Sequence, residues 1–279
     1  MTDAASLETS DIIPADAEKI EKQVALIQSV FKRFGFQAIK TSTIEFSENL
    51  EHALGDYLKQ NCIEFFDPSG RRLMLRPDHT TPIARLAATR LKHHAHPLQL
   101  SYIDPVFRRD SKAWANDTEL LQAGCEIIGD SKPEADASLI LCCIDALEAL
   151  GFSDFGIDIG HVAFSSGLDD AKREALLKGD YVSFGKIPKR CQDFSSAPSD
   201  LKAVYELINS KGQADKLYLN EGLVHGIYYY TGLIFQVYVK GCSEILASGG
   251  RYDKLCSSFG VDQPAVGFAL NLNAIRKAV

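Results

Sequence analysis

The feature that most constrains this chain is a series of alternating apolar segments joined by turns rather than by helices. LQLSYIDPVFRRD leads through a polar loop to ELLQAGCEIIG, and LIFQVYVKG is followed by EILASGG and AVGFALNL. Alternation with a period of two predicts strands, and strands joined without a crossover helix pair antiparallel. Helical segments stand beside these hairpins rather than between every pair of strands. The order therefore favours an antiparallel sheet covered by helices, which is an α+β fold.

The rest of the chain supplies helices and shorter strands. Residues 15–34 place apolar side chains on one helical face and end at Gly35, and a second strong helix follows Pro133 and runs to residue 150. We also predict a strand over 36–45, a hairpin over 62–78 with its turn at 67–70, a helix from Thr80 to about Leu91, and a strand over 155–164.

Length and pattern predict one domain, residues 1–279, with a change of character near residue 165. The 279 residues suffice for a large core. Residues 165–218 contain charged helical fragments with little strand pattern, which indicates a helical insertion.

Composition narrows the classes of function. The net charge of −7 argues against a protein that grips a phosphate backbone, since that affinity comes from Lys and Arg. Seven scattered cysteines without a CxxC pair indicate reduced thiols, and Cys142–Cys143 on a predicted helix indicate core packing. No signal-like or membrane-length apolar run occurs, so we expect a cytoplasmic chain with no membrane partner. The HHAH stretch, 93–96, has no carboxylate or cysteine nearby, and we expect no metal site.

Polar groups gather at the ends of the predicted strands and along one strand face. Gln122 and Glu126 lie four residues apart on one strand, so they share a face with Gly124 between them. The other groups are Asp78, Thr80, Arg108, Arg109, tyrosines 228–230 at the start of a predicted strand, and Arg251 after Gly249–Gly250. The glycines would let a ligand approach the sheet closely.

Each of these groups also has an ordinary structural explanation. An arginine pair at a strand end is commonly a solvated surface, tyrosines commonly pack in a core, and paired glycines commonly form a bulge. The pattern by itself therefore predicts only a polar pocket on a sheet.

Seven segments occur in an order that resembles the histidyl-tRNA synthetases. They are LRPDHTTPIARLA, YIDPVFRRD, LLQAGCEIIG, DASLILCCIDALEALGF, LVHGIYYYTGLIFQVY, SGGRYDKL and PAVGFALNL. The resemblance covers most of residues 15–275 and is weakest over 165–218. It implies the catalytic core of a class II aminoacyl-tRNA synthetase.

The chain departs from that family where the synthetases handle ATP. The final synthetase motif carries an arginine that holds the ATP phosphates, and the matching stretch here is Asn271 to Ala274. A second synthetase arginine falls on His225, the aspartate after it on Tyr228, and the proline of the first motif on Ser42. The loop SKAWANDTE is nearly neutral where the synthetase loop is basic, and we expect the anticodon-binding domain to be missing. We therefore expect adenylation to be lost, because it depends on preorganised positive charge.

The amino-acid side of the pocket is kept. The resemblance implies a histidine-binding set made of Asp78, Thr80, Arg108, Gln122, Glu126, Tyr229 and Tyr230. In that set the α-amino group would meet Asp78, Thr80 and Gln122, and the carboxylate would pair with Arg108. The imidazole would lie at Glu126 and Tyr230. This combination suits a zwitterion with a second basic ring. Asp78 is one methylene shorter than the usual glutamate, so its contact would be longer or water-mediated.

A synthetase-like chain without these parts resembles the regulatory subunit of ATP phosphoribosyltransferase. The resemblance implies that it activates a short-form catalytic subunit, which makes phosphoribosyl-ATP in the first step of histidine biosynthesis. It also implies feedback inhibition through bound L-histidine, and dimers of this chain within a hetero-octamer. No catalytic residue, cofactor, metal or tRNA partner is expected.

Two other functions stay open from the sequence. One is a stand-alone class II-like ligase that activates an amino acid, for which Arg108 and Arg251 remain as candidate ATP ligands. The other is a degenerate module that docks on RNA or a kinase, which predicts a basic face that the acidic composition does not favour.

Overall fold

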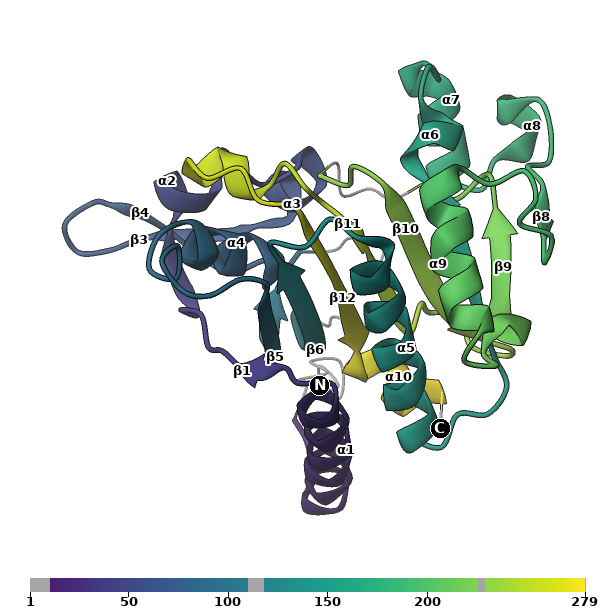
Figure 1. Cartoon of the computed structure of the whole chain (residues 1–279). Coiled ribbons are helices and arrows are strands. Elements are labelled where there is room, and N and C mark those ends of the chain that lie inside the picture. The colour runs from purple at the N-terminus through teal and green to yellow at the C-terminus, as the bar shows by residue number, and fades with distance from the viewer. Residues whose placement is uncertain (1–10, 110–117, 225–228, 279) are drawn as a thin grey trace, which may run out of the picture.

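The computed structural model describes residues 11–109, 118–224 and 229–278, which form a large sheet and a small sheet with helices around them (Figure 1). The large sheet has nine strands in the spatial order β1 (Gln37–Ala38), β5 (Leu98–Phe107), β6 (Glu119–Ile128), β12 (Ala265–Asn271), β11 (Ala247–Arg251), β10 (Leu233–Val239), β7 (Phe155–His161), β9 (Leu217–Asn220) and β8 (Arg190–Cys191). The small sheet has the order β2 (Ile44–Phe46), β4 (Arg72–Leu75), β3 (Ile63–Phe66).

Antiparallel pairing dominates both sheets, so the prediction of an α+β fold is confirmed. The parallel pairs are β1 with β5 and β7 with β9, where a longer connection separates the two strands. The helices are α1 (Pro14–Arg33), α2 (Ser47–Leu50), α3 (Asp56–Asn61), α4 (Thr80–Ala88), α5 (Pro133–Ala149), α6 (Val162–Ser165), α7 (Asp170–Leu177), α8 (Tyr181–Phe184), α9 (Ser199–Asn209) and α10 (Leu272–Ala278).

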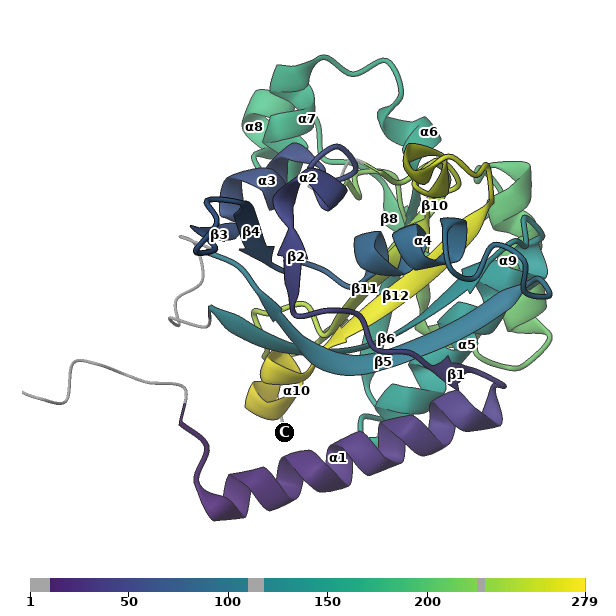
Figure 2. The ribbon, with the colours of Figure 1, turned by 90° about the vertical axis from the view of Figure 1, so that its left-hand side faces the viewer.

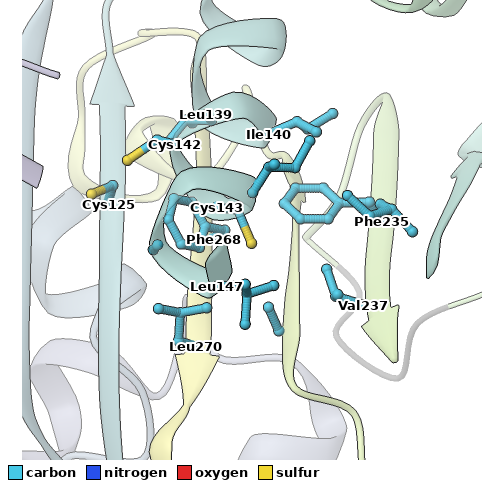
Figure 3. Close-up of a cluster of buried hydrophobic side chains, with 14 of the residues drawn as sticks. Cys125, Leu139, Ile140, Cys142, Cys143, Leu147, Phe235, Val237, Phe268 and Leu270 are labelled. Atoms are coloured by element: carbon cyan, nitrogen blue, oxygen red, sulfur yellow. The ribbon is translucent and has the colours of Figure 1, made fainter. Parts of the chain in front are cut away.

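The main core lies on one face of the large sheet, under α1, α5, α9 and α10. Figure 2 shows α1, α5 and α10 on that face and α4 on the opposite one. The middle helix α5 is apolar on most of its surface because it packs between the sheet and its neighbours, α1 and α9. In Figure 3, Leu139 and Leu147 of α5 lie with Phe268 and Leu270 of the sheet, and Cys143 lies among them. The predicted core role of Cys142–Cys143 is confirmed, since both are fully buried.

The opposite face of the sheet is only partly covered. Helix α4 and the 3-10 turn at Cys256–Phe259 pack over β5 and the adjoining ends of β6 and β12. The rest of this face, toward β10 and β11, carries the polar side chains discussed below. The one-sided cover therefore leaves room for a pocket.

Two predicted elements differ in the structure. The strand expected over 36–45 is divided into β1 and β2, because the chain leaves the large sheet after Ile39 and joins the small one. Buried Arg76 holds this crossover, with its guanidinium donating to the Thr41 carbonyl at 2.9 Å and its backbone N–H to the Thr43 carbonyl. The helix expected to reach Leu91 ends at Ala88, where the Thr89 hydroxyl bonds the Arg85 carbonyl at 2.6 Å.

The segment 165–218 contributes more than helices. Strands β8 and β9, which the sequence did not predict, extend the large sheet beyond β7. Leu201, Val204 and Ile208 of α9 belong to the main core. Helices α7 and α8 instead stand at one end of the molecule (Figure 1). Of the helices in the described ranges, none combines the length and apolar character required to cross a bilayer.

Candidate binding pocket

A cavity of about 310 Å³ lies on the partly covered face of the large sheet. Its base is formed by β6, β10, β11 and β12, and its sides by the residues before α4, after β5 and before β10. Six of the seven predicted site residues line it: Asp78, Thr80, Arg108, Gln122, Tyr229 and Tyr230. The two tyrosines precede β10, which begins at Leu233, and do not start the strand as predicted.

Asp78 presents a buried carboxylate to this pocket. It is 4% exposed. Its Oδ2 accepts hydrogen bonds from the Thr81 hydroxyl at 2.9 Å and the Thr81 backbone N–H at 3.3 Å. Its Oδ1 has no partner among the described residues. Burial raises the pKa of Asp78, although Thr81 and Arg108 oppose the shift. An oxygen of this kind is a strong acceptor for a cationic N–H group.

Glu126, the seventh predicted residue, lies behind the pocket wall rather than on it. Its Oε1 accepts from the Thr80 hydroxyl at 2.8 Å, and its Oε2 accepts from the Tyr252 hydroxyl. Both of those donors line the pocket. Burial raises the pKa of Glu126 to about 8, against the lowering effect of its hydrogen bonds. Glu126 therefore acts on the pocket through the hydroxyl groups that it orients.

Arg108 is the one residue with a fixed positive charge among the described residues that line the pocket. Its Nε donates to the Pro77 carbonyl at 2.6 Å, which is the only side-chain hydrogen bond it makes within the described ranges. The terminal NH₂ groups remain able to form a bidentate contact with a carboxylate.

The glycines on this face make room for the protein's own side chains. A Cβ at Gly124 would overlap the Tyr102 hydroxyl, and one at Gly267 would overlap the Glu126 carboxylate. At Gly250 a Cβ would lie 2.9 Å from the Tyr230 ring. The space beside these three glycines is thus filled by the protein's own side chains, and the expectation that glycines let a ligand approach the sheet closely stays a prediction.

Part of an aromatic wall was missed by the sequence reasoning, which named Tyr229 and Tyr230 as site residues but not His79, Tyr102 or Tyr252. Neutral His79 stacks on Tyr102 with 4.2 Å between ring centroids, and burial lowers the pKa of His79 to about 3. Its Nε2 lies 3.0 Å from the Asp104 carbonyl, so Nε2 carries the proton. Tyr229 packs edge-on against both Tyr230 and Tyr252. No local pattern marked His79 or Tyr102, because the stack joins two separate elements.

The other end of the pocket is polar but uncharged. It was also missed, and its residues include Gln236, Ser248 and Asn271. Gln236 and Ser248 stand opposite each other on β10 and β11. The sequence signal that could have revealed these residues is a single polar residue within each apolar strand segment.

The end of the chain that replaces the synthetase phosphate motif is built into the fold. Asn271 Oδ1 accepts from the Ala274 backbone N–H at 3.1 Å, at the start of α10. Asn273 Oδ1 accepts from the Leu121 N–H at 3.0 Å, which fixes the start of β6. Ala274 is fully buried.

Arg251 is likewise engaged elsewhere. Its guanidinium pairs with Asp136 at 2.9 Å and with Asp253 at 3.0 Å, and it does not line the pocket. His225, Tyr228 and residues 110–117 of the loop lie outside the described residues. Among the residues that are described, no group of three metal-ligand side chains occurs.

The pocket as built can hold a small zwitterion. Its described residues offer a carboxylate oxygen without a partner among them, one guanidinium, hydroxyl groups and an aromatic wall. Arg108 is the one fixed positive charge among the described lining residues, and it alone is a poor match for a triphosphate, whose stabilisation depends on several cationic groups.

Comparison with known proteins gives consistent results. A family model described as histidyl-tRNA synthetase matches residues 8–182 and 185–275. The ATP phosphoribosyltransferase regulatory subunit of Geobacter sulfurreducens is 33% identical, over 97% of this chain and 72% of the relative. The protein of the same name from Acetivibrio thermocellus is 32% identical, over 91% and 71%. A crystal structure from Bacillus halodurans, titled as an ATP phosphoribosyltransferase regulatory subunit/histidyl-tRNA synthetase, superposes with a TM-score of 0.83 at 27% identity, over 97% of this chain and 81% of that one.

Proposed function

Since the chain belongs to the family of ATP phosphoribosyltransferase regulatory subunits, which has the class II synthetase fold, we propose that it activates a short-form catalytic subunit and binds L-histidine as feedback inhibitor. The family is one of regulatory rather than catalytic subunits. The histidine site in this proposal is the pocket that contains Asp78 and Arg108.

The observation that carries the ligand assignment is the charge arrangement of that pocket. Asp78 Oδ1 is buried, has no partner in the described part of the chain, and suits an ammonium group. Arg108 suits the carboxylate, and the Thr80 and Tyr252 hydroxyls held by Glu126 suit a ring with N–H groups. In this assignment Glu126 contributes by orienting those hydroxyls, because its own oxygens are already bonded.

The competing ligase function has less support. Ala274 is buried in α10, and Arg251 is held by Asp136 and Asp253. Arg108 alone does not supply the positive charge that adenylation requires.

In this proposal, feedback inhibition results from thermodynamic linkage between histidine binding and the state of the assembly. Histidine must bind one state of the assembly more tightly than the other, and it then shifts the activity of the catalytic partner by that difference. The coupling is reciprocal, so the catalytic subunit must also change the affinity for histidine.

We also propose that a second copy of this chain covers the small sheet. Six apolar side chains share one face of that sheet by strand register, and none of them is buried in a single chain. They are Ile44, Phe46, Ile63, Phe65, Leu73 and Leu75. An apolar face of this kind, with the Arg71 guanidinium over the Phe46 ring at its edge, suits the two-fold contact of a dimer within the larger hetero-octamer.

The test is a rate assay with the short-form catalytic subunit from the same source. Formation of phosphoribosyl-ATP is followed with and without this chain, and histidine is then titrated. We expect activation by the chain and loss of that activation with histidine. An unchanged rate, together with ATP–pyrophosphate exchange by this chain alone with an amino acid, would establish the ligase function instead.

A further inference from the structure

An exposed apolar patch lies far along the chain from the pocket residues, on the lobe formed by α7 and α8, residues 170–189. Val182 is 92% exposed and Ile187 is 81% exposed, and Leu177 and Tyr181 are also exposed. Among the described residues, no other stretch of similar length holds four large exposed apolar side chains. Isolated exposed apolar residues are ordinary, but a cluster of them marks an interaction site.

A groove accompanies the patch. It has a volume of about 380 Å³ and is lined in part by Phe164, Leu168, Phe184 and Pro188. Lys186 and Pro188 line the groove and are the chain neighbours of Ile187, so the groove lies beside that end of the patch. Figure 1 shows α7 and α8 at the end of the molecule opposite α1, where a partner could reach them.

The lobe is basic although the chain is acidic. Residues 170–189 contain five Lys or Arg and three Asp or Glu, whereas the whole chain has a net charge of −7. Two of the three acids are used inside the lobe. Asp180 accepts from the Ser183 backbone N–H and hydroxyl, and Glu174 pairs with Lys178. Lys186 and Lys189 have no ion-pair partner within the described ranges.

The positive charge of the lobe distinguishes between two binding partners, a second copy of this chain and a different protein. A second copy of this chain would place one basic lobe against another in a two-fold contact, which is electrostatically unfavourable. A protein partner with an apolar patch bordered by carboxylates is complementary. We propose that the α7–α8 lobe is the docking surface for the catalytic subunit, an inference that rests on the proposed function.

The lobe is also connected to the pocket by hydrogen bonds. The Val162 N–H at the start of α6 donates to the Gly232 carbonyl at 3.0 Å, two residues after Tyr230 of the pocket. Arg173 of α7 donates to the Ser165 carbonyl at the end of α6. A partner on the lobe is thus joined through α6 to the residues that line the ligand site.

The experiment compares a Val182→Asp/Ile187→Asp double variant with an Ile12→Asp/Ile13→Asp control. Ile12 and Ile13 are 50% and 62% exposed and lie at the start of α1. Affinity for the catalytic subunit is measured by surface plasmon resonance, and activation by the rate assay. We expect the lobe variant to bind about tenfold or more weakly, with the control unchanged. Lys186→Glu/Lys189→Glu should also weaken binding and reduce its dependence on salt.

The outcomes separate this inference from the proposed function. If wild-type chain activates the catalytic subunit and the lobe variant does so with equal affinity, the lobe is not the docking surface. If wild-type chain neither binds nor activates it, the proposed function and this inference both fail. Self-association of wild type that the lobe variant abolishes would overturn the inference in favour of a second copy. Binding of wild type, but not the variant, to phosphatidylserine-containing vesicles would assign the lobe to a membrane surface instead.

Discussion

Replacing Glu126 with glutamine should change how the stability of the protein depends on pH. Burial raises the pKa of Glu126 from an ordinary 4.5 to about 8 in the folded chain. The folded state therefore holds a proton that the unfolded state releases between these values. The contribution of Glu126 to the free energy of unfolding is fully present below about pH 4.5 and is lost as the pH rises through about 8.

The size of the effect follows from the shift. Each pKa unit corresponds to about 1.4 kcal/mol, so the contribution should fall by about 4 kcal/mol between about pH 5 and about pH 9. Glutamine resembles the neutral acid, and it can still accept from the Tyr252 hydroxyl. The free energy of unfolding of Glu126→Gln, relative to that of wild type, should therefore rise by about 4 kcal/mol from about pH 5 to about pH 9.

Urea unfolding followed by far-UV circular dichroism at several pH values measures the difference directly. Glu21→Gln, at an exposed position of α1, is the matched control and should run parallel to wild type. Other carboxyl groups whose pKa is raised by burial, such as that of Asp136, are present in all three proteins, so their effects cancel in the comparison. Parallel curves for wild type and Glu126→Gln would show that Glu126 is charged in the fold, and would refute the reasoning.

Three further outcomes are expected. Arg108→Ala should weaken histidine binding by about 1.5–3 kcal/mol in calorimetry, since a hydrogen-bonded charge pair is lost. The exposed control Arg109→Ala should leave the affinity unchanged. Equal histidine affinities of Arg108→Ala and wild type would show that Arg108 does not bind the carboxylate. Asp78→Asn should raise the unfolding midpoint of the ligand-free chain and lower histidine affinity about tenfold or more, because Oδ1 carries unpaired charge only when no ligand is bound; a variant that binds normally would contradict this. Ile44→Glu should convert the proposed dimer to monomer in analytical ultracentrifugation, whereas Phe66→Glu on the opposite face should not. A dimer that Ile44→Glu leaves unchanged would show that the small sheet is not the contact.

Local patterns in the sequence were sufficient for most of the fold. Alternation predicted β5, β6, β10 and β12. Helical periodicity predicted α1 and, with a leading proline, α5. The hairpin of β3 and β4 followed from its turn, where Asp67 accepts from the Ser69 and Arg71 N–H groups. These elements were predictable because the forces that form them act between residues close in the chain.

Features that depend on distant partners were not predictable in this way. Arg251 appeared free to bind phosphate, but its partner Asp136 lies 115 residues away. The predicted strand at 36–45 is divided because Arg76 binds the chain where it crosses between two sheets. Six pocket residues were identified because the local pattern marks their polar groups and the resemblance to the synthetases selects them. The stack of His79 on Tyr102 joins two elements that only the fold brings together.

The pocket frame persists without the phosphate group because its supports are internal to the protein. Asn271 fixes the start of α10 and Asn273 fixes the start of β6, and both use their side chains for backbone contacts that require no nucleotide. The Thr80 and Tyr252 hydroxyls are held in the same way by Glu126. A site supported by such contacts is formed before any ligand arrives, so the proposed binding of an amino acid requires no nucleotide to complete the pocket. That property suits the proposed feedback sensor, since a pocket that needed ATP to complete it would report two metabolites at once.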